Sequence, residues 1–177
     1  LLFSAQGNFF GKEQSSNFTE QLIQGDQNVA PQKTRTDFSE ARNTIKLDYT
    51  KPFNEQFTLE TGGQFLSIDV SNDFEVQNSV DGEFVADPSF TNVFDFTQNV
   101  LGVYGTLAYE GTKWGIKGGL RLEDTRVNTL LRTTNESNEQ QFANLFPSFS
   151  SSYKVNEVFS LRYFSEASNK VICSPLG

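Results

Sequence analysis

Long stretches of this chain alternate between apolar and polar residues, and the clearest lies at residues 101–128. Trp114, Ile116, Gly118, Leu120 and Leu122 fall on one face of the second half of this stretch. Glycine and charged residues fall on the other face. The pattern continues for about ten residues, whereas a globular strand usually has about 5–6. Such a strand needs two different environments, which either a soluble sheet or a membrane barrel with lipid outside and water inside can supply.

The same alternation predicts seven strands, joined by connections that are alternately long and short. We expect the strands at about residues 1–12, 39–51, 57–73, 101–109, 114–128, 142–154 and 158–168. Polar segments at about 13–37, 72–93 and 133–141 are expected to be long loops. Short turns are expected at 52–56, 110–113 and 155–157. In the third strand the apolar parity changes after Phe65, which indicates either a bulge or an extension beyond a membrane.

Aromatic residues flank each predicted short turn. We interpret them as membrane-interface residues, because the ring of Tyr or Trp combines an apolar body with a group that can stay hydrated. Ordinary packing within a sheet is the alternative, since aromatic residues are common in strands. The six residues are Tyr49, Phe57, Tyr109, Trp114, Tyr153 and Phe159.

Composition narrows the possibilities. The 177 residues include 18 Phe and no His or Met, yet only 36% are hydrophobic. No window approaches the run of about 18 apolar residues that a membrane helix needs, so the chain would have to span a membrane as a barrel. The net charge is −8, and no Lys or Arg lies between Lys51 and Lys113. Such an acidic stretch repels phosphate, which argues against nucleic-acid binding.

In the predicted strands, charged and polar residues occupy the alternate positions that face away from the apolar side. In a barrel they would face the lumen, and Arg121 and Glu123 could pair with each other, pair with neighbours or hold a plug. A mutually neutralised face is the interpretation that we favour over substrate contact. The lumen-facing candidates are Lys46, Asp48, Glu60, Gln64, Lys117, Arg121, Glu123, Ser160 and Arg162.

The sequence offers no catalytic or metal-binding constellation. There is no His, and the single thiol, Cys173, cannot form an internal disulfide. The acidic segment 69–95 has oxygen ligands, and Asp81-Gly82-Glu83 resembles part of a calcium loop, but the regular ligand spacing is missing. We expect a solvated external loop there, no enzyme activity and no cofactor.

Short motifs give the chain a family resemblance over about residues 44–163. Four motifs occur in order, at Asp48–Pro52 (DYTKP), Gly119–Glu123 (GLRLE), Phe146–Ser148 (FPS) and Ser152–Tyr163 (SYKVNEVFSLRY). In these motifs the chain resembles the barrel of TonB-dependent outer-membrane receptors, especially the branch called the outer-membrane β-barrel family.

The resemblance implies a function and partners. It implies an antiparallel up-and-down transmembrane β-barrel of about 22 strands in a Gram-negative outer membrane, with lipid around it and a plug inside it. It also implies import of a scarce nutrient, such as a metal chelate, vitamin or oligosaccharide, powered by a TonB-type partner acting on the plug.

The chain departs from the family in several places. We find no plug domain or TonB-contacting box, residues 164–177 differ from the family pattern, and no signal peptide opens the chain. We therefore expect residues 1–177 to be an internal fragment, about seven strands of a larger barrel. A passive porin or structural barrel shares these patterns, and a soluble β-sandwich that binds glycans or proteins also alternates.

Overall fold

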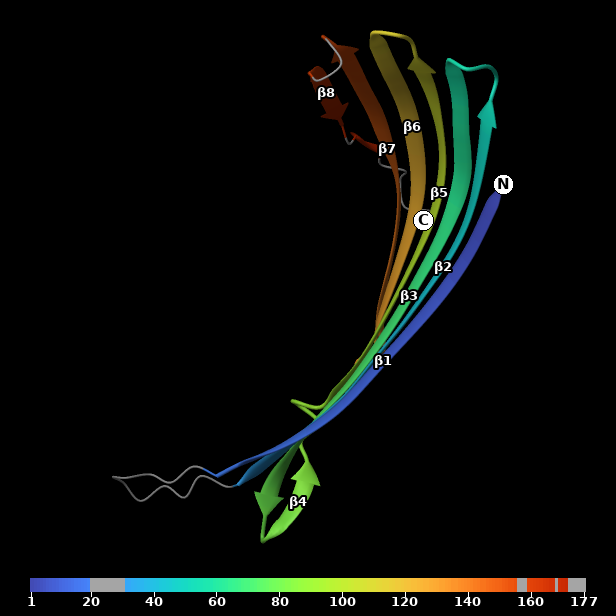
Figure 1. Cartoon of the computed structure of the whole chain (residues 1–177). Helices are drawn as coiled ribbons and strands as arrows, with labels where there is room; N and C mark the ends of the chain where they lie inside the picture. Colours follow the sequence, from blue (N-terminus) through green and yellow to red (C-terminus); the bar gives the residue numbers. More distant parts are fainter. Residues whose placement is uncertain (20–30, 156–158, 168, 172–177) are drawn as a thin grey trace.

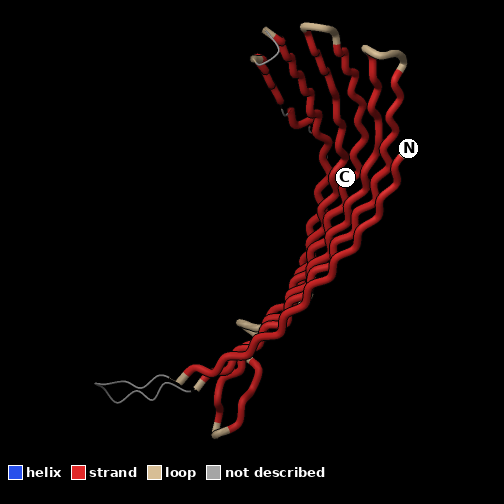
Figure 2. Tube along the Cα trace, in the orientation of Figure 1, coloured by secondary structure: helices blue, strands red, loops and turns tan. Residues whose placement is uncertain are grey.

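The computed structural model describes residues 1–19, 31–155, 159–167 and 169–171, and strands dominate all of them (Figures 1 and 2). No described residue belongs to a helix that is long and apolar enough to cross a bilayer. The strands are β1 (Leu2–Phe18), β2 (Gln32–Pro52), β3 (Phe57–Val80), β4 (Glu83–Ala86), β5 (Asn92–Glu110), β6 (Trp114–Leu131), β7 (Glu136–Lys154), β8 (Ser160–Glu166) and β9 (Asn169–Val171).

These strands form one antiparallel, up-and-down sheet. The order is β1-β2-β3-β5-β6-β7-β8, which matches the seven predicted strands, and the short strands β4 and β9 pair with β3 and β7. The turns from β2 to β3 and from β5 to β6 lie at one end, and β4 lies at the other (Figure 1). Within the described part of the chain β1 and β8 are the edges of the path, so the sheet is open.

The strands are longer than the sequence predicted. Residues 20–30 of the loop expected at 13–37 lie outside the described residues. The rest of that segment, with 72–93 and 133–141, instead contributes the ends of β1, β2, β3 and β7, and all of β4. The prediction failed because backbone pairing requires no apolar side chain, so polar residues extend the ladder without an alternation signal. The acidic segment turns sharply at Asp81 and Gly82, whose φ values are 51° and 88°. An Asp-Gly pair suits such a hairpin turn.

Two further predictions need correction. Pro52 lies at the end of β2, opposite Thr58, so the turn begins at Phe53. The Asn54 side chain closes this turn by accepting hydrogen bonds from the backbone N–H groups of Gln56 and Phe57. The bulge proposed after Phe65 is absent, because β3 keeps one register with β2 and with β5 along its whole length.

Register places the side chains on two distinct faces. We call the side that carries Ile45, Leu47, Leu120, Leu122 and Leu161 the apolar face, and the opposite side the charged face. These five side chains are 45–56% exposed, and Val76 is the only buried hydrophobic residue among those described. No second sheet of the described chain covers the apolar face, which contradicts the β-sandwich alternative.

Glycines show that the charged face is the more crowded of the two. A Cβ added to Gly62 or Gly102, on the charged face, would lie within 3 Å of neighbouring atoms. A Cβ added to Gly105 or Gly118, on the apolar face, would meet nothing within 4 Å. This difference is expected for a sheet that curves toward its charged face.

Candidate functional site

The eight charged or amide candidates from the sequence all lie on the charged face. They come from β2, β3, β6 and β8, and the register of each neighbouring pair of strands gives them the same side. They are Lys46, Asp48, Glu60, Gln64, Lys117, Arg121, Glu123 and Arg162. Ser160 shares this side. The sheet thus brings together residues that are far apart in sequence.

A tyrosine that the sequence analysis missed organises the first cluster. Asp48, Gly62 and Tyr104 are register neighbours on three adjacent strands. Because Gly62 has no side chain, Tyr104 lies across it and its hydroxyl donates a hydrogen bond to Asp48. The Lys46 ammonium lies 3.0 Å from the other oxygen of Asp48. The sequence did contain a signal for Tyr104, because alternation places it on the polar side of its strand together with Gly102 and Thr106.

Arg121 and Glu123 form the second cluster. The Arg121 Nε–H donates to Glu123 at 2.6 Å, and the guanidinium carbon lies 5.5 Å from the centre of the Tyr104 ring. A Cβ on Gly102 would lie 2.8 Å from an Arg121 nitrogen, so the arginine also lies over a glycine. Tyr104 therefore contacts both clusters, and both lie on the charged face.

Lys117 reaches across a whole strand to its partner. Its ammonium lies 2.6 Å from Glu60, although β5 separates their strands. The strand between them presents Ala108 and Thr106, whose short side chains leave room for this contact. Both charged side chains remain more than 40% exposed.

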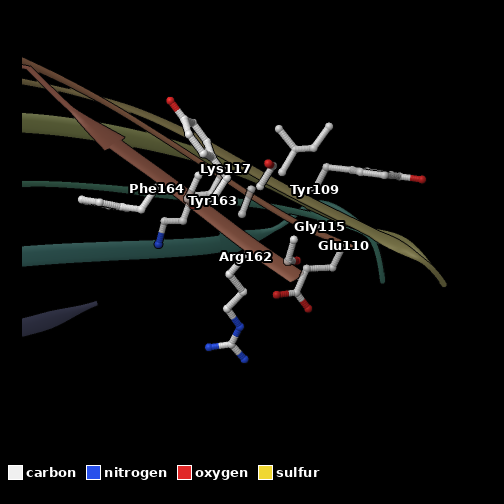
Figure 3. A pocket seen from close by; sticks show the side chains of 12 residues that line it. Tyr109, Glu110, Gly115, Lys117, Arg162, Tyr163 and Phe164 are labelled. Carbon is white, nitrogen blue, oxygen red and sulfur yellow. The ribbon is translucent and has the colours of Figure 1, made fainter. Parts of the chain in front are cut away.

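The remaining candidates lie beside these pairs. Gln64 is the register neighbour of Lys46 and Gly102, and Arg162 is opposite Ser152. Within residues 1–19, 31–155, 159–167 and 169–171, no carboxylate forms an ion pair with Arg162. An open hollow of about 360 Å³ lies beside it, and there Lys117, Glu110 and Arg162 project to one side and Tyr163 to the other (Figure 3).

These contacts define the chemistry of the charged face. Three of its four predicted cations, Lys46, Lys117 and Arg121, are paired with carboxylates. Such partly exposed pairs contribute about 0–1 kcal/mol each, so they neutralise the wall more than they stabilise it. No three His, Cys, Asp or Glu side chains of the described residues are arranged to hold a metal ion. The arrangement is a polar, nearly neutral wall.

The predicted interface aromatics gather near the short turns. Phe57 packs on Tyr109 with ring centres 4.9 Å apart, and Trp114 packs on Tyr153 at 4.5 Å. Tyr49 is 42% exposed on the apolar face, and Phe159 is 55% exposed just before β8. The expected turn at 155–157 lies partly outside the described residues. The aromatic rings thus form a row along one end of the sheet.

A separate polar network lies on the same side as the apolar face, nearer the β4 end of the strands. Asp95 accepts hydrogen bonds from the Arg132 guanidinium and from the Ser71 hydroxyl. On this side of β5 the exposed apolar side chains end at Leu101, and Asp95 lies well beyond it. The Arg132 hydrogen bond holds the pKa of Asp95 below its ordinary value of 3.8, despite partial burial.

This network gives a pH-dependent prediction. A carboxyl whose pKa is lowered by folding stabilises the fold above its unfolded pKa, and that contribution disappears as the pH falls through the folded pKa. We expect the Asp95–Arg132 contact to persist at pH 4 and to be lost only as the pH falls through the folded pKa, which lies below 3.8. An NMR titration of the Asp95 carboxyl carbon, assigned by Asp95→Asn, measures this directly. Titration at or above the ordinary value would contradict the contact.

Comparison with known proteins agrees with this architecture. The model of the outer membrane protein beta-barrel family matches residues 1–169. Among solved structures, the chain is similar to the crystal structure of the ferric citrate transporter FecA in the unliganded form, with a TM-score of 0.60 and 13% sequence identity. The match covers 93% of this chain and 24% of the transporter, so this chain spans about a quarter of its length.

A comparison with curated proteins finds no match. The family model nevertheless covers nearly the whole chain, and the fold agrees with it. The chain belongs to the outer membrane protein β-barrel family.

Proposed function

We propose that the chain is part of a TonB-dependent outer-membrane receptor that imports a scarce nutrient. Family membership places the chain in the outer membrane of a Gram-negative cell. The observation that carries the proposal is the fold match to a transporter over 93% of the chain. The order of the short motifs at residues 48–52, 119–123, 146–148 and 152–163 supports the same assignment.

In this proposal the two faces of the sheet have separate roles. The apolar face contacts lipid, because Leu120, Leu122 and Leu161 are exposed with no protein cover among the described residues. The charged face lines a watery lumen, where the paired Lys117 and Glu60 can remain hydrated. The aromatic row then lies at the periplasmic interface, and the β4 end points outward.

The remaining parts of the receptor would come from outside this segment. Further strands would pair with β1 and β8, because an unpaired strand edge cannot be hydrated inside lipid. A plug would fill the lumen, and a TonB-type partner would act on that plug to supply energy. The substrate class stays within the three proposed: a metal chelate, a vitamin or an oligosaccharide.

Energy coupling tests the proposal against a passive porin. Cells with and without the full-length protein would be given radiolabelled ferric citrate, cobalamin or a malto-oligosaccharide. We expect one of these to accumulate only when both the full-length protein and TonB are present, and to stop accumulating when a protonophore collapses the proton gradient.

The same experiment has a clear opposite outcome. Uptake that persists without TonB, together with steady conductance of the purified protein in a planar bilayer, would identify a passive porin. Absence of protein-dependent uptake of all three compounds would contradict import of these classes.

A further inference from the structure

On β3 and β5 the two faces of the sheet exchange their polarity partway along the strands. On β5 the apolar face shows Leu107, Val103 and Leu101, and then continues as Asn99, Thr97 and Asp95. On β3 the same face ends its apolar run at Phe65 and continues as Ser67 and Asp69. The exchange therefore occurs at the same level on neighbouring strands.

On β3 and β5 the opposite face changes in the reverse direction at this level. Beyond Gln64, β3 presents Leu66, Ile68 and Val70 on the side that carries the charged wall. Val100 and Phe96 lie beside them on β5. These side chains are half-buried, and Thr125, next to Val100, is only 4% exposed. Apolar side chains thus pack on the inner side of β3 and β5 above this level, whereas β2 keeps Arg42 and Glu40 on that side.

The register excludes a local backbone defect as the cause. Phe65 pairs with Leu101 and Leu66 with Val100 without a shift, and the same register continues on either side. Because the backbone keeps its register, each side chain stays on its own side of the sheet. The change in polarity must therefore reflect a change in what surrounds the sheet. An uninterrupted strand with reversed polarity is expected where it passes from lipid into an aqueous layer.

The length of the apolar stretch agrees with a membrane. On β6 it runs from Trp114 to the level of Asp124. Ten residues rising by about 3.3 Å, in a strand tilted by about 40°, span about 25 Å of membrane thickness. This equals the height of the outward apolar band of outer-membrane barrels.

We propose that the strands leave the membrane at the level of Ile45, Phe65, Leu101 and Asp124. Above this level, the outward side chains form a polar collar that contacts the headgroup layer of the outer leaflet. The collar consists of Asn43, Ser67, Asn99, Arg126 and Gln141, followed by Asp69, Thr97, Asn128 and Glu139. The assignment to the outer leaflet rests on the orientation given by the proposed function.

Continuity and chemistry identify headgroups as the partner. The collar follows directly on the lipid-contacting face of the same strands, so the next layer of the membrane meets it. Its amide, hydroxyl and charged groups suit headgroup oxygens and phosphates, and it is partly ordered by its own contacts. Thr97 and Ser67 both donate to Asp69, and Gln141 donates to Asp124. Phe9, on the edge strand β1, and its register neighbour Ala41 on β2 are apolar exceptions.

Site-specific fluorescence quenching tests the proposed exit level. The full-length protein, with Cys173 and other cysteines replaced by Ser, would carry single cysteines at Val103, Asn99 or Val100, each labelled with bimane. It would be reconstituted in phosphatidylcholine vesicles containing nitroxide either at the acyl chain or at the headgroup. Leu122→Cys and Arg126→Cys on β6 repeat the comparison if a β5 variant does not fold.

The three β5 positions should give three different results. The label at Val103 is expected to be quenched several-fold more by the acyl-chain nitroxide, and the label at Asn99 several-fold more by the headgroup nitroxide. Val100 adjoins Asn99 but faces inward, so neither nitroxide should quench its label strongly.

Other patterns would overturn the proposal. Strong acyl-chain quenching at Asn99 or Val100 would show that the lipid band continues past this level. Quenching of Asn99 by neither nitroxide would show that protein or water, and not headgroups, surrounds the collar. These results do not depend on transport, so a passive porin could show the expected quenching while the proposed import failed.

Discussion

Replacing Gly62 by alanine is expected to destabilise the sheet by about 1–3 kcal/mol, the usual cost of inserting a group into a filled site. The new Cβ would lie 2.5 Å from the backbone oxygen of Leu47 and 2.6 Å from the Tyr104 hydroxyl oxygen. The tyrosine can swing away only by giving up its hydrogen bond to Asp48. The backbone oxygen cannot move without disturbing the β2–β3 ladder.

Urea unfolding of the full-length protein in phospholipid vesicles measures this loss. Gly105→Ala is the matched control, because its Cβ would meet nothing within 4 Å on the adjoining strand. We expect the control to change stability little, or to raise it slightly by restricting the unfolded chain. Equal stability of the two variants would show that Tyr104 does not lie across Gly62.

Replacing Leu120 by arginine is expected to have a larger effect. Leu120 is 52% exposed and lies midway along the apolar stretch, where we place lipid. An arginine on the lipid side of a barrel costs about 2–4 kcal/mol at the bilayer midplane and about 0–1 kcal/mol near the interface. The same unfolding assay in vesicles reports the difference.

Asn128→Arg provides the comparison for this charge. Asn128 is on the same strand and the same side, but it lies in the polar collar. We expect it to cost far less than Leu120→Arg. If both variants were equally stable, or if Asn128→Arg were the more damaging, the apolar face would not be the lipid-contacting surface at residue 120.

The sequence predicted much of the charged wall because side-chain direction in a strand is a local property. Alternation alone placed Lys46 with Asp48, and Arg121 with Glu123, on the same side of their strands. It could not show that Lys117 reaches Glu60, because that contact depends on how three strands are aligned. Tyr104 was missed for the same reason, since its position matters only when Gly62 lies opposite.

Strand length was the main error, and it has a related cause. Sequence alternation identifies a strand only where its two faces have different surroundings and the same face stays apolar along the strand. Past Phe65 the polarity reverses, and near Glu136 both faces are polar, so the signal weakened while the backbone ladder continued.

The sequence by itself determined the class of fold, the number of principal strands, the short turns near Asn54 and Gly111, and the side on which each strand is apolar. All of these follow from the two-residue period of a strand and the local chemistry of turns. The tertiary structure alone decided the registers, the full lengths of the strands and the partners of the charged groups. Those depend on contacts between strands, because hydrogen bonds join residues that are dozens of positions apart and the side chains that meet across them have no common sequence pattern.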